Sequence, residues 1–299
     1  MRLDGFDLNL LVALDALLAE RNVTRAAERL NVTQSAMSAS LKRLREALGD
    51  ELLVQSGRNM IPTANALVLA PRLTEELVRL RSLLSAGTAF EPASSTRRFR
   101  IAASDYISTV LLVPVQRLLQ GEAPGIAMEI SLPVDSTADG LAKGDFDLIL
   151  TPSDFVAANH PSELLFEERQ VIVGCKHNPI FAQAIDLDTF KAARHAAVRI
   201  DGRNTFVENA LDRLDIALRP EVIAPSFIQI PYFLPGTRLI TLMHERLARQ
   251  MAQILPLAIA SAPFAIPPMQ EMAQYHSARA GDDALRWLIG RIKAVADAT

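Results

Sequence analysis

Residues 22–45 read Asn-Val-Thr-Arg-Ala-Ala-Glu-Arg-Leu-Asn-Val-Thr-Gln-Ser-Ala-Met-Ser-Ala-Ser-Leu-Lys-Arg-Leu-Arg. The apolar spacing predicts two helices, over 23–30 and 34–47, joined by a tight turn. Asn31 suits that turn because asparagine tolerates the left-handed backbone conformation better than most residues. Thr33 is the expected N-cap of the second helix, since its hydroxyl can accept a backbone N–H there. This helix pair decides the fold of the N-terminal part of the chain.

The second of these helices has two different faces. Its apolar residues are spaced like a stripe that packs against other helices; they are Met37, Leu41, Leu44 and Leu48. The other side carries small polar and basic residues, namely Ser35, Ser38, Lys42 and Arg45. A helix with such a face suits the major groove of DNA, where small side chains allow close approach and polar ones meet base edges.

The candidate DNA contacts are Gln34, Ser35, Ser38, Lys42 and Arg58. Gln34 can pair with adenine through two hydrogen bonds, and the serines let the helix lie deep in the groove. Lys42 suits a phosphate, and Arg58 on a wing suits the backbone or the minor groove. The alternative interpretation is that these side chains only solvate an exposed helix face. Arg43 and Arg45 are interpreted as surface ion-pair residues.

Further elements flank this helix pair. A first helix is expected over residues 6–20, with Asp7 as its N-cap. After Gly49, the alternation up to Met60 predicts a short hairpin, or wing, with Ser56-Gly57 at its tip.

A long helix is predicted from Pro62-Thr63 to about residue 85. Its apolar residues follow a heptad spacing: Ala66, Ala70, Leu73, Leu77, Leu80 and Leu84. Such a seam predicts pairing with the same helix of a second copy, and therefore a dimer. Pro71 is expected to kink the helix or to force a restart.

Charge is distributed unevenly along the 299 residues, whose formal net charge is −3. Residues 21–60 hold seven basic and four acidic residues, a local net charge of +3. Residues 88–299 hold 20 basic and 24 acidic residues, a net charge of −4. A modestly basic N-terminal part on an acidic body favours DNA binding by one end only.

The remainder of the chain alternates short apolar runs with helical patterns, which is typical of α/β domains. Residues 85–96 are small, polar and proline-containing, and we interpret them as a linker. Strands are predicted at 99–103, 127–132, 146–150, 171–175, 196–200, 221–224, 239–242 and 272–276. Helices are predicted at 107–120, 137–143, 205–214, 244–252 and 282–297. We expect two subdomains, connected by crossing segments near 165–170 and 265–272.

Several functional classes lack their sequence signature. Cys175 is the only cysteine, so an intrachain disulfide is impossible, and five scattered histidines show no metal-ligand spacing. We therefore predict no metal and no cofactor. The chain contains no Gly-x-Ser-x-Gly elbow, no Gly-x-Gly-x-x-Gly and no phosphate loop, so an α/β enzyme is the less favoured alternative. No apolar run is long enough to span a bilayer, and Asp4 and Asp7 argue against a secretory signal, so we expect a cytoplasmic location and no membrane partner.

The motif Ala26-Ala27-x-x-Leu30-x-Val32-x-Gln34-x-Ala36-x-Ser38-x-x-Leu41-x-x-Leu44 resembles the winged helix-turn-helix of LysR-type transcriptional regulators. The similarity continues through Gly57-Arg58 and Pro62-Thr63 and covers the whole chain. The stretches Asp7–Asp15, Val173–Cys175, Tyr275-His276 and Arg286–Leu288 resemble the branch of flavonoid-responsive nodulation regulators and aromatic-catabolism regulators. Ser35 and Ala39 stand where many members have proline and arginine, which leaves the operator preference open.

The resemblance implies a winged helix-turn-helix (1–61), a linker helix (62–86), a hinge (87–96) and a periplasmic-binding-protein-like α/β effector domain (97–299). Within the effector domain, the resemblance implies one subdomain at about 97–168 and 270–299 and another at about 169–269. It also implies an inducer cleft between these subdomains. Ligands of α/β domains bind beyond the carboxyl ends of strands, which selects Ser104, Tyr106, Thr151, Asp201, Phe206 and Phe227 as effector-binding candidates.

The aromatic candidates favour an aromatic or otherwise apolar inducer, and free N–H groups at helix starts could hold a carboxylate or phenolate. Ser104 could instead be a helix cap alone, and Phe206 and Phe227 plain core. The expected function is a regulator whose inducer shifts the arrangement of a dimer or tetramer on an operator, and so its contact with RNA polymerase. A ligand-independent DNA-binding protein is the other alternative.

Overall fold

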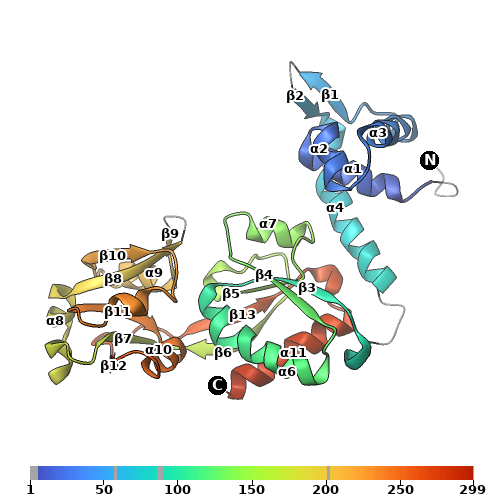
Figure 1. Ribbon diagram of the computed structural model, residues 1–299. Helices are drawn as coiled ribbons and strands as arrows, with labels where there is room; N and C mark the ends of the chain where they lie inside the picture. Colours follow the sequence, from blue (N-terminus) through green and yellow to red (C-terminus); the bar gives the residue numbers. More distant parts are fainter. Residues whose placement is uncertain (1–5, 57–58, 86–89, 201–202, 299) are drawn as a thin grey trace. The chain divides into compact units, whose positions relative to one another are not determined.

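The computed structural model describes residues 6–56, 59–85, 90–200 and 203–298. The chain divides into two compact units, an N-terminal one formed by residues 1–88 with 142–144 and a C-terminal one formed by the rest of the chain (Figure 1). The N-terminal unit consists of α1 (Asn9–Glu20), α2 (Val23–Arg29), α3 (Gln34–Leu48), β1 (Leu53–Ser56), β2 (Asn59–Pro62) and α4 (Ala64–Ser85). This order is the predicted one, three helices followed by a wing and a long helix.

Side-chain caps define the starts of both α2 and α3. The side chain of Asn22 accepts a hydrogen bond from the N–H of Arg25 at 3.0 Å and starts α2. The Thr33 hydroxyl accepts from the N–H of Ala36 at 3.2 Å and starts α3, which confirms the predicted cap. Asn31 has a φ of 55°, the left-handed conformation expected of the turn. The helix pair therefore has the geometry that its sequence predicts.

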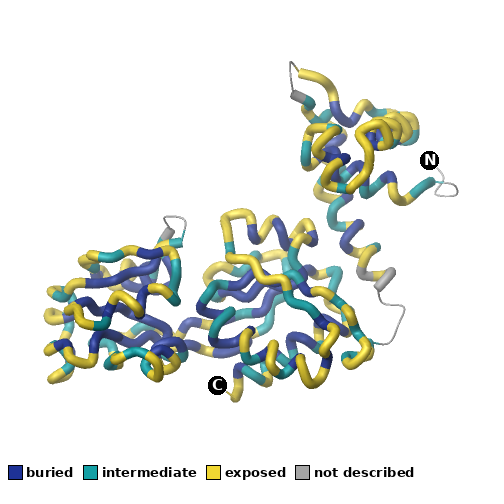
Figure 2. Tube along the Cα trace, viewed as in Figure 1, coloured by how far each residue is buried: buried dark blue, intermediate teal, exposed yellow. Residues whose placement is uncertain are grey.

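The stripe of α3 forms part of the core of the N-terminal unit. Met37, Leu41 and Leu44 are buried in a cluster with residues of α1 and α2. Ala26 and Ala27 on α2 are also buried, and their small side chains allow α3 to pack closely. The other face of α3 remains exposed (Figure 2).

The wing is a two-stranded antiparallel hairpin in which Leu53 pairs with Pro62 and Ser56 with Asn59. The tip was predicted at Ser56-Gly57; Ser56 ends β1, and Gly57 lies outside the described residues. The Asp50 carboxylate anchors the hairpin by accepting from the Leu52 N–H at 2.7 Å and the Thr63 hydroxyl at 2.6 Å.

Helix α4 runs from Ala64 to Ser85 and continues through Pro71, so the predicted restart does not occur. The predicted heptad seam is not an exposed surface. Ala66, Leu73 and Leu77 are buried in the core of the same unit, beside α1. Packing against the same chain accounts for these three of the six seam residues, so the spacing alone does not require a partner helix. The exposed large apolar residues of α4 are Leu67, Val68 and Leu83. The side chain of Leu84 lies outside the described ones.

The C-terminal unit contains two sheets, and the first has the order β4-β3-β5-β13-β6. Its strands are β3 (Arg98–Ala102), β4 (Ala127–Ser131), β5 (Leu148–Pro152), β6 (Ser162–Glu168) and β13 (Met269–Gln274). Strand β3 pairs in parallel with β4 and β5, whereas β13 runs antiparallel to β5 and β6. The helices of this first subdomain are α5 (Asp105–Ile107), a π-helical turn (Ser108–Leu112), α6 (Val113–Glu122), α7 (Thr137–Ala142) and α11 (Asp283–Ala298).

The second sheet has the order β10-β8-β11-β7-β12, with β9 pairing on β8. Its strands are β7 (Gln170–Cys175), β8 (Arg194–Ile200), β9 (Arg203–Asn204), β10 (Pro220–Ala224), β11 (Leu239–His244) and β12 (Leu257–Ser261). Strands β10, β8 and β11 are parallel neighbours, and β7 is antiparallel to β11 and β12. This second subdomain adds α8 (Leu187–Ala192), α9 (Phe206–Arg213) and α10 (Glu245–Ala252).

The chain passes between the subdomains twice. Strand β6 ends at Glu168 and β7 begins at Gln170, so one residue separates the two sheets there. The return runs from β12 to β13, between Ser261 and Met269. All eight predicted strands have a counterpart, but β6, β9, β12 and α8 were not predicted. Strand β6 reads Ser-Glu-Leu-Leu-Phe-Glu-Glu, and its acidic ends mask the apolar centre.

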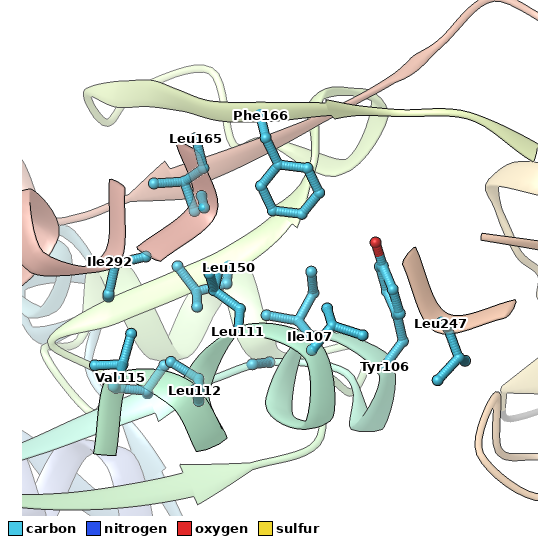
Figure 3. Packing of buried hydrophobic residues seen from close by; sticks show 14 of the residues in the cluster. Tyr106, Ile107, Leu111, Leu112, Val115, Leu150, Leu165, Phe166, Leu247 and Ile292 are labelled. Atoms are coloured by element: carbon cyan, nitrogen blue, oxygen red, sulfur yellow. The ribbon is translucent and has the colours of Figure 1, made fainter. Parts of the chain in front are cut away.

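One buried cluster runs through both subdomains and includes residues of α5, the π-helical turn, β5, β6, α10 and α11. Figure 3 shows Tyr106 and Leu247 at one end of the drawn residues, with Leu111 and Val115 farther along the helix. Among the described residues, no helix is both long and apolar enough to cross a membrane.

Candidate functional site

The predicted recognition face of α3 is exposed to solvent. Gln34, Ser35, Ser38 and Lys42 are all exposed, whereas Met37 and Leu41 between them are buried. The Ser35 hydroxyl lies 3.0 Å from the Thr33 hydroxyl, within hydrogen-bond distance. Arg58, the fifth predicted DNA contact, lies outside the described residues. Four of the five candidates therefore share one accessible surface of one helix.

The two arginines that were interpreted as ion-pair residues do form ion pairs. Arg43 lies 3.5 Å from the Asp7 carboxylate. Arg45 lies 3.1 Å from the Glu51 carboxylate and donates to the Leu53 carbonyl at 2.7 Å. The guanidinium of Arg45 therefore joins α3 to the wing and is occupied within the chain.

A cavity of about 280 Å³ lies in the C-terminal unit and is lined by both subdomains. The first subdomain contributes the loop before α5, the end of β5, residues 133–138 and part of β13. The second contributes the segment from Asn204 to Phe206, together with Ile200, Phe227 and His244. The lining is mainly apolar, with hydroxyl groups at Ser104, Thr137, Thr151 and Thr205.

Five of the six predicted effector-binding residues line this cavity: Ser104, Tyr106, Thr151, Phe206 and Phe227. The sixth, Asp201, lies outside the described residues. These five come from four separate stretches of sequence and from both subdomains. The tertiary structure brings them together because each follows, or lies near, the end of a strand.

Ser104 has the capping role that was the alternative to ligand binding. Its hydroxyl accepts a hydrogen bond from the Ile107 N–H at 3.2 Å and is the N-cap of α5. The residue also lines the cavity, and it is half-buried. Capping uses a lone pair of the oxygen, so its hydrogen can still be donated to another acceptor.

Tyr106 is buried and its hydroxyl donates a hydrogen bond to the Glu168 carboxylate. Its ring stacks on the His244 imidazole, with centroids 3.9 Å apart and planes 7° from parallel. Burial, together with the neighbouring Glu168 carboxylate, raises the pKa of Tyr106 above its usual value. Tyr106 therefore meets the cavity with its ring, and its hydroxyl is occupied.

The two phenylalanines form apolar walls. Phe227 contacts Tyr106 edge-on, with centroids 6.2 Å apart, and lies 5.0 Å from the His244 ring in a similar orientation. Phe206 is 7% exposed and belongs to the buried cluster as well as to the cavity lining. Aromatic edges and faces of this kind suit another flat ring.

The helix starts at the cavity are already capped by the chain itself. Thr205 and Glu208 form a capping box at the start of α9, in which Glu208 accepts from the Thr205 N–H at 2.9 Å. At α5, Asp105 accepts from the N–H of Tyr106 at 2.8 Å, beside the Ser104 cap. The N–H groups of Tyr106, Ile107 and Glu208 at these two helix starts are therefore bonded within the chain.

Sequence reasoning missed two buried polar residues of the lining, Glu271 and His244. Glu271 lies on β13 and is 1% exposed, and His244 ends β11 and is 3% exposed. Neither residue belongs to a motif, and an acid or a histidine in a strand is usually exposed. The only sequence signal was a polar residue within an otherwise buried strand. Gln274, also in the lining, bonds Ala157 through both amide atoms and so fixes a loop.

A helix-turn-helix with a wing, followed by a two-sheet α/β unit with a cavity between its sheets, defines a DNA-binding transcriptional regulator with a substrate-binding domain. The chain belongs to the LysR family. Residues 8–67 match the bacterial regulatory helix-turn-helix protein of the lysR family, and residues 92–297 match the LysR substrate binding domain. The predicted fold class and family are thereby confirmed.

Relatives and solved structures agree with this assignment. Nodulation protein D 2 of Rhizobium tropici is 38% identical over 290 residues, which are 96% of this chain and 92% of that protein. Nodulation protein D 2 of Sinorhizobium fredii is 38% identical over 292 residues, 96% of this chain and 93% of that protein. The predicted likeness to nodulation regulators is therefore confirmed.

Two solved structures match along nearly the whole chain. A probable transcriptional regulator from Pseudomonas aeruginosa is 32% identical, with a TM-score of 0.66 and 98% of both chains covered. A full-length OxyR variant from Pseudomonas aeruginosa has a TM-score of 0.73 over 97% of this chain and 95% of that chain. Its identity is 18%, so this second likeness shows the fold alone.

Proposed function

We propose that α3 reads the major groove of an operator through Gln34, Ser35, Ser38 and Lys42, with Arg58 on the wing adding a contact to the DNA backbone or minor groove. The observation that supports the α3 contacts is their common exposure on one helix face, opposite a buried stripe. Two such helices in a dimer would enter successive major grooves about 34 Å apart. The exposed apolar residues Leu67, Val68 and Leu83 of α4 give the dimer a candidate contact surface.

The cavity between the subdomains binds the effector, which is a small aromatic molecule. The single observation that carries this proposal is the cavity of about 280 Å³ with aromatic walls and few polar groups. Natural ligand sites are commonly apolar clefts with a small number of placed polar groups. Ser104, Tyr106, Thr151, Phe206 and Phe227 are the contacts on the described residues, and Asp201 is a further candidate.

Effector binding shifts the population of subdomain arrangements, because a ligand that touches both subdomains stabilises the arrangement it fits. In a dimer or a tetramer this changes the spacing of the DNA-binding units and the bend of the promoter, and hence contact with RNA polymerase. The site of action is the cytoplasm, where operator DNA is reached. We propose no catalytic function.

Two measurements test this function. Isothermal titration of the full-length protein with a panel of small aromatics should detect binding, and Phe227→Ala should weaken it at least about tenfold, since an aromatic wall is lost. DNA fragments recovered with the protein from fragmented genomic DNA should then shift in gels, and the binding aromatic should alter the footprint. Operator binding without any response to aromatics would favour the ligand-independent alternative.

A further inference from the structure

Arg45 fastens the last turn of α3 to the first residues of the wing. Its Nε donates a hydrogen bond to the Glu51 carbonyl at 2.8 Å, and its Nη2 donates to the Leu53 carbonyl at 2.7 Å. The Glu51 carboxylate adds an ion pair at 3.1 Å, but this side chain is 66% exposed, so the ion pair contributes little. The two bonds to the backbone use the rigid fork of a guanidinium, in which neighbouring nitrogens donate together. One side chain of α3 therefore holds two carbonyls of the wing.

The backbone that Arg45 holds is strained. Leu52, which lies between the two carbonyl partners, has a φ of 61°, a region in which a bulky residue is an outlier. The Leu53 N–H bonds to the Glu51 carbonyl at 2.6 Å and closes a three-residue turn of a rare and strained kind. Such conformations persist only where their surroundings over-determine them, and they cluster at functional sites. The bonds from Arg45 and the burial of the Leu52 side chain, which is 1% exposed, hold this turn.

Asp50 joins the entry of the wing to its exit. One carboxylate oxygen accepts from the Leu52 N–H at 2.7 Å and from the Thr63 hydroxyl at 2.6 Å, and the other accepts from the Asn65 amide at 3.2 Å. Thr63 follows β2, and Asn65 lies in the first turn of α4. The turn at Leu52 is therefore bonded to the end of α3 through Arg45 and to the start of α4 through Asp50.

The direction of the wing is set at this base. The wing is a two-stranded hairpin, and an isolated hairpin is only marginally stable. Within β1, Leu53 is buried, whereas Val54, Gln55 and Ser56 are exposed. The strand thus leaves the core after its first residue, and its path follows from how that residue is held.

We propose that Arg45 and Asp50 are positioning residues for DNA binding, which fix the wing against α3 and do not themselves touch DNA. Helix and wing then meet adjacent parts of the operator as one preformed surface. This inference rests on the proposed contacts of α3 and of Arg58 with DNA. A preformed surface raises affinity because the wing does not lose conformational freedom on binding.

A purely electrostatic role for the two residues predicts a different pattern from positioning. Arg45→Lys keeps the positive charge but loses the fork, since an ammonium is a compact point charge. Asp50→Ala removes a negative charge, which by electrostatics alone would strengthen DNA binding. Positioning instead predicts that both variants weaken it. The two explanations differ in magnitude at Arg45 and in direction at Asp50.

The test uses the full-length protein and a duplex selected from random DNA by the wild-type protein, with affinity measured by fluorescence anisotropy at several KCl concentrations. Arg45→Lys and Asp50→Ala should each weaken binding at least about tenfold near 0.1 M salt, and should lower the slope of log K against log salt by about one, as for one lost phosphate contact. A smaller folded fraction alone would leave that slope unchanged. Binding by Arg45→Lys at the wild-type level, or tighter binding by Asp50→Ala, would overturn the proposal.

The matched control is Arg43→Lys, which makes the same change on the same helix. Arg43 pairs with Asp7 at 3.5 Å, and its side chain is 56% exposed. Because a lysine retains the charge of such an exposed ion pair, the affinity of this variant should change by less than about twofold. A loss as large as that of Arg45→Lys would show that any arginine of α3 matters, and would contradict the special role of Arg45.

Arg58→Ala locates the effect on the wing. In this background, which lacks the proposed wing contact, Arg45→Lys should weaken binding by less than about twofold more, since the two changes act through one interaction. An undiminished loss would show that Arg45 acts on DNA directly, and would overturn the proposal. Asp50→Ala in the same background decides the question if an Arg45 variant does not fold. If the wild-type protein selects no duplex at all, the proposed DNA-binding function fails, and this inference with it.

Discussion

The carboxylate of Asp105, at the start of α5 in the first subdomain, accepts a hydrogen bond from the Ser226 hydroxyl in the second subdomain at 2.5 Å. The same carboxylate accepts from the backbone N–H of Phe227 at 3.3 Å and of Ile228 at 3.2 Å. Its neighbours Ser104 and Tyr106, and Phe227 across from it, line the cavity. One carboxylate therefore joins the two subdomains directly beside the proposed effector.

Asp105→Asn should weaken that connection, because an amide has a single accepting oxygen for the three donors of the second subdomain and the N–H of Tyr106. We expect the free energy of unfolding to fall by about 1–3 kcal/mol, as for loss of hydrogen bonds to a charged group. Urea denaturation measures it, with Asp188→Asn, an exposed aspartate at the start of α8, as the control. Equal stability of the two variants would show that the Asp105 contact does not stabilise the domain.

Gln34→Ala or Ser38→Arg should abolish specific operator binding without unfolding the protein. Gln34 would lose its pair of hydrogen bonds to a base, worth about 1–3 kcal/mol of discrimination, and an arginine at Ser38 would block close approach. Gel shifts measure this effect, and circular dichroism checks folding. Ser40→Ala is the control on the same helix, because the Ser40 hydroxyl bonds to the Ala36 carbonyl at 3.0 Å. Normal affinity in both Gln34→Ala and Ser38→Arg would contradict the assigned face.

Two variants of α4 should affect two different properties, the stability of the fold and the strength of the dimer. Leu73→Ala should lower the free energy of unfolding by about 2–5 kcal/mol, as for other buried leucines, since Leu73 is 6% exposed. Val68→Glu, on an exposed side chain, should leave the fold intact and weaken the dimer. Denaturation and sedimentation velocity measure the two effects. A dimer that resists Val68→Glu and Leu67→Glu together would place the contact elsewhere.

Tyr106→Phe should destabilise the C-terminal unit by about 1–3 kcal/mol, because the buried Glu168 carboxylate loses a hydrogen-bond donor. Tyr232→Phe is the control, since Tyr232 is 58% exposed. Thermal or urea denaturation of the full-length protein measures the difference. If both variants unfold alike, the Tyr106–Glu168 bond contributes nothing to stability.

The stabilising effect of Asp50 should depend on pH. Hydrogen bonds from the Thr63 hydroxyl, then from the Leu52 N–H, lower the pKa of Asp50 in the folded chain. Its contribution is therefore complete above the pKa of the unfolded chain, about 4, and is lost as the pH falls through the lower folded value. The stability difference between wild type and Asp50→Asn should shrink between pH 6 and pH 3. A difference that stays constant would contradict the anchoring role.

The local structure of the N-terminal unit could be predicted because its signals are short-range. Thr33 and Asn31 act on neighbouring backbone groups, and the spacing of Met37, Leu41 and Leu44 selects one helix face. The strand ends that carry Ser104 and Thr151 were also predictable, since the carboxyl ends of parallel strands meet at one edge of a sheet.

Reasoning from short-range spacing could not identify which residues cover the apolar face of α4. The heptad spacing of α4 predicts a buried stripe, and such a stripe exists, but Leu73 and Leu77 bury it against the same chain. The spacing of apolar residues shows that one face of a helix is apolar, but it does not identify the residues that cover that face. The sequence left open whether Ser104 caps its helix or binds the effector, because a cap formed by the chain's own side chains needs a rotamer that spacing does not specify.

By itself, the sequence determined the winged helix-turn-helix, the two-sheet α/β architecture and the family, since periodicity, caps and motifs are properties of neighbouring residues. Only the tertiary structure decided that Ser104, Thr151 and Phe227 line one cavity, and that Glu271 and His244 lie buried in its lining. The physical reason is that burial and charge state depend on residues from distant strands, and desolvation by those residues decides whether a side chain is an ion or a neutral hydrogen-bonding group.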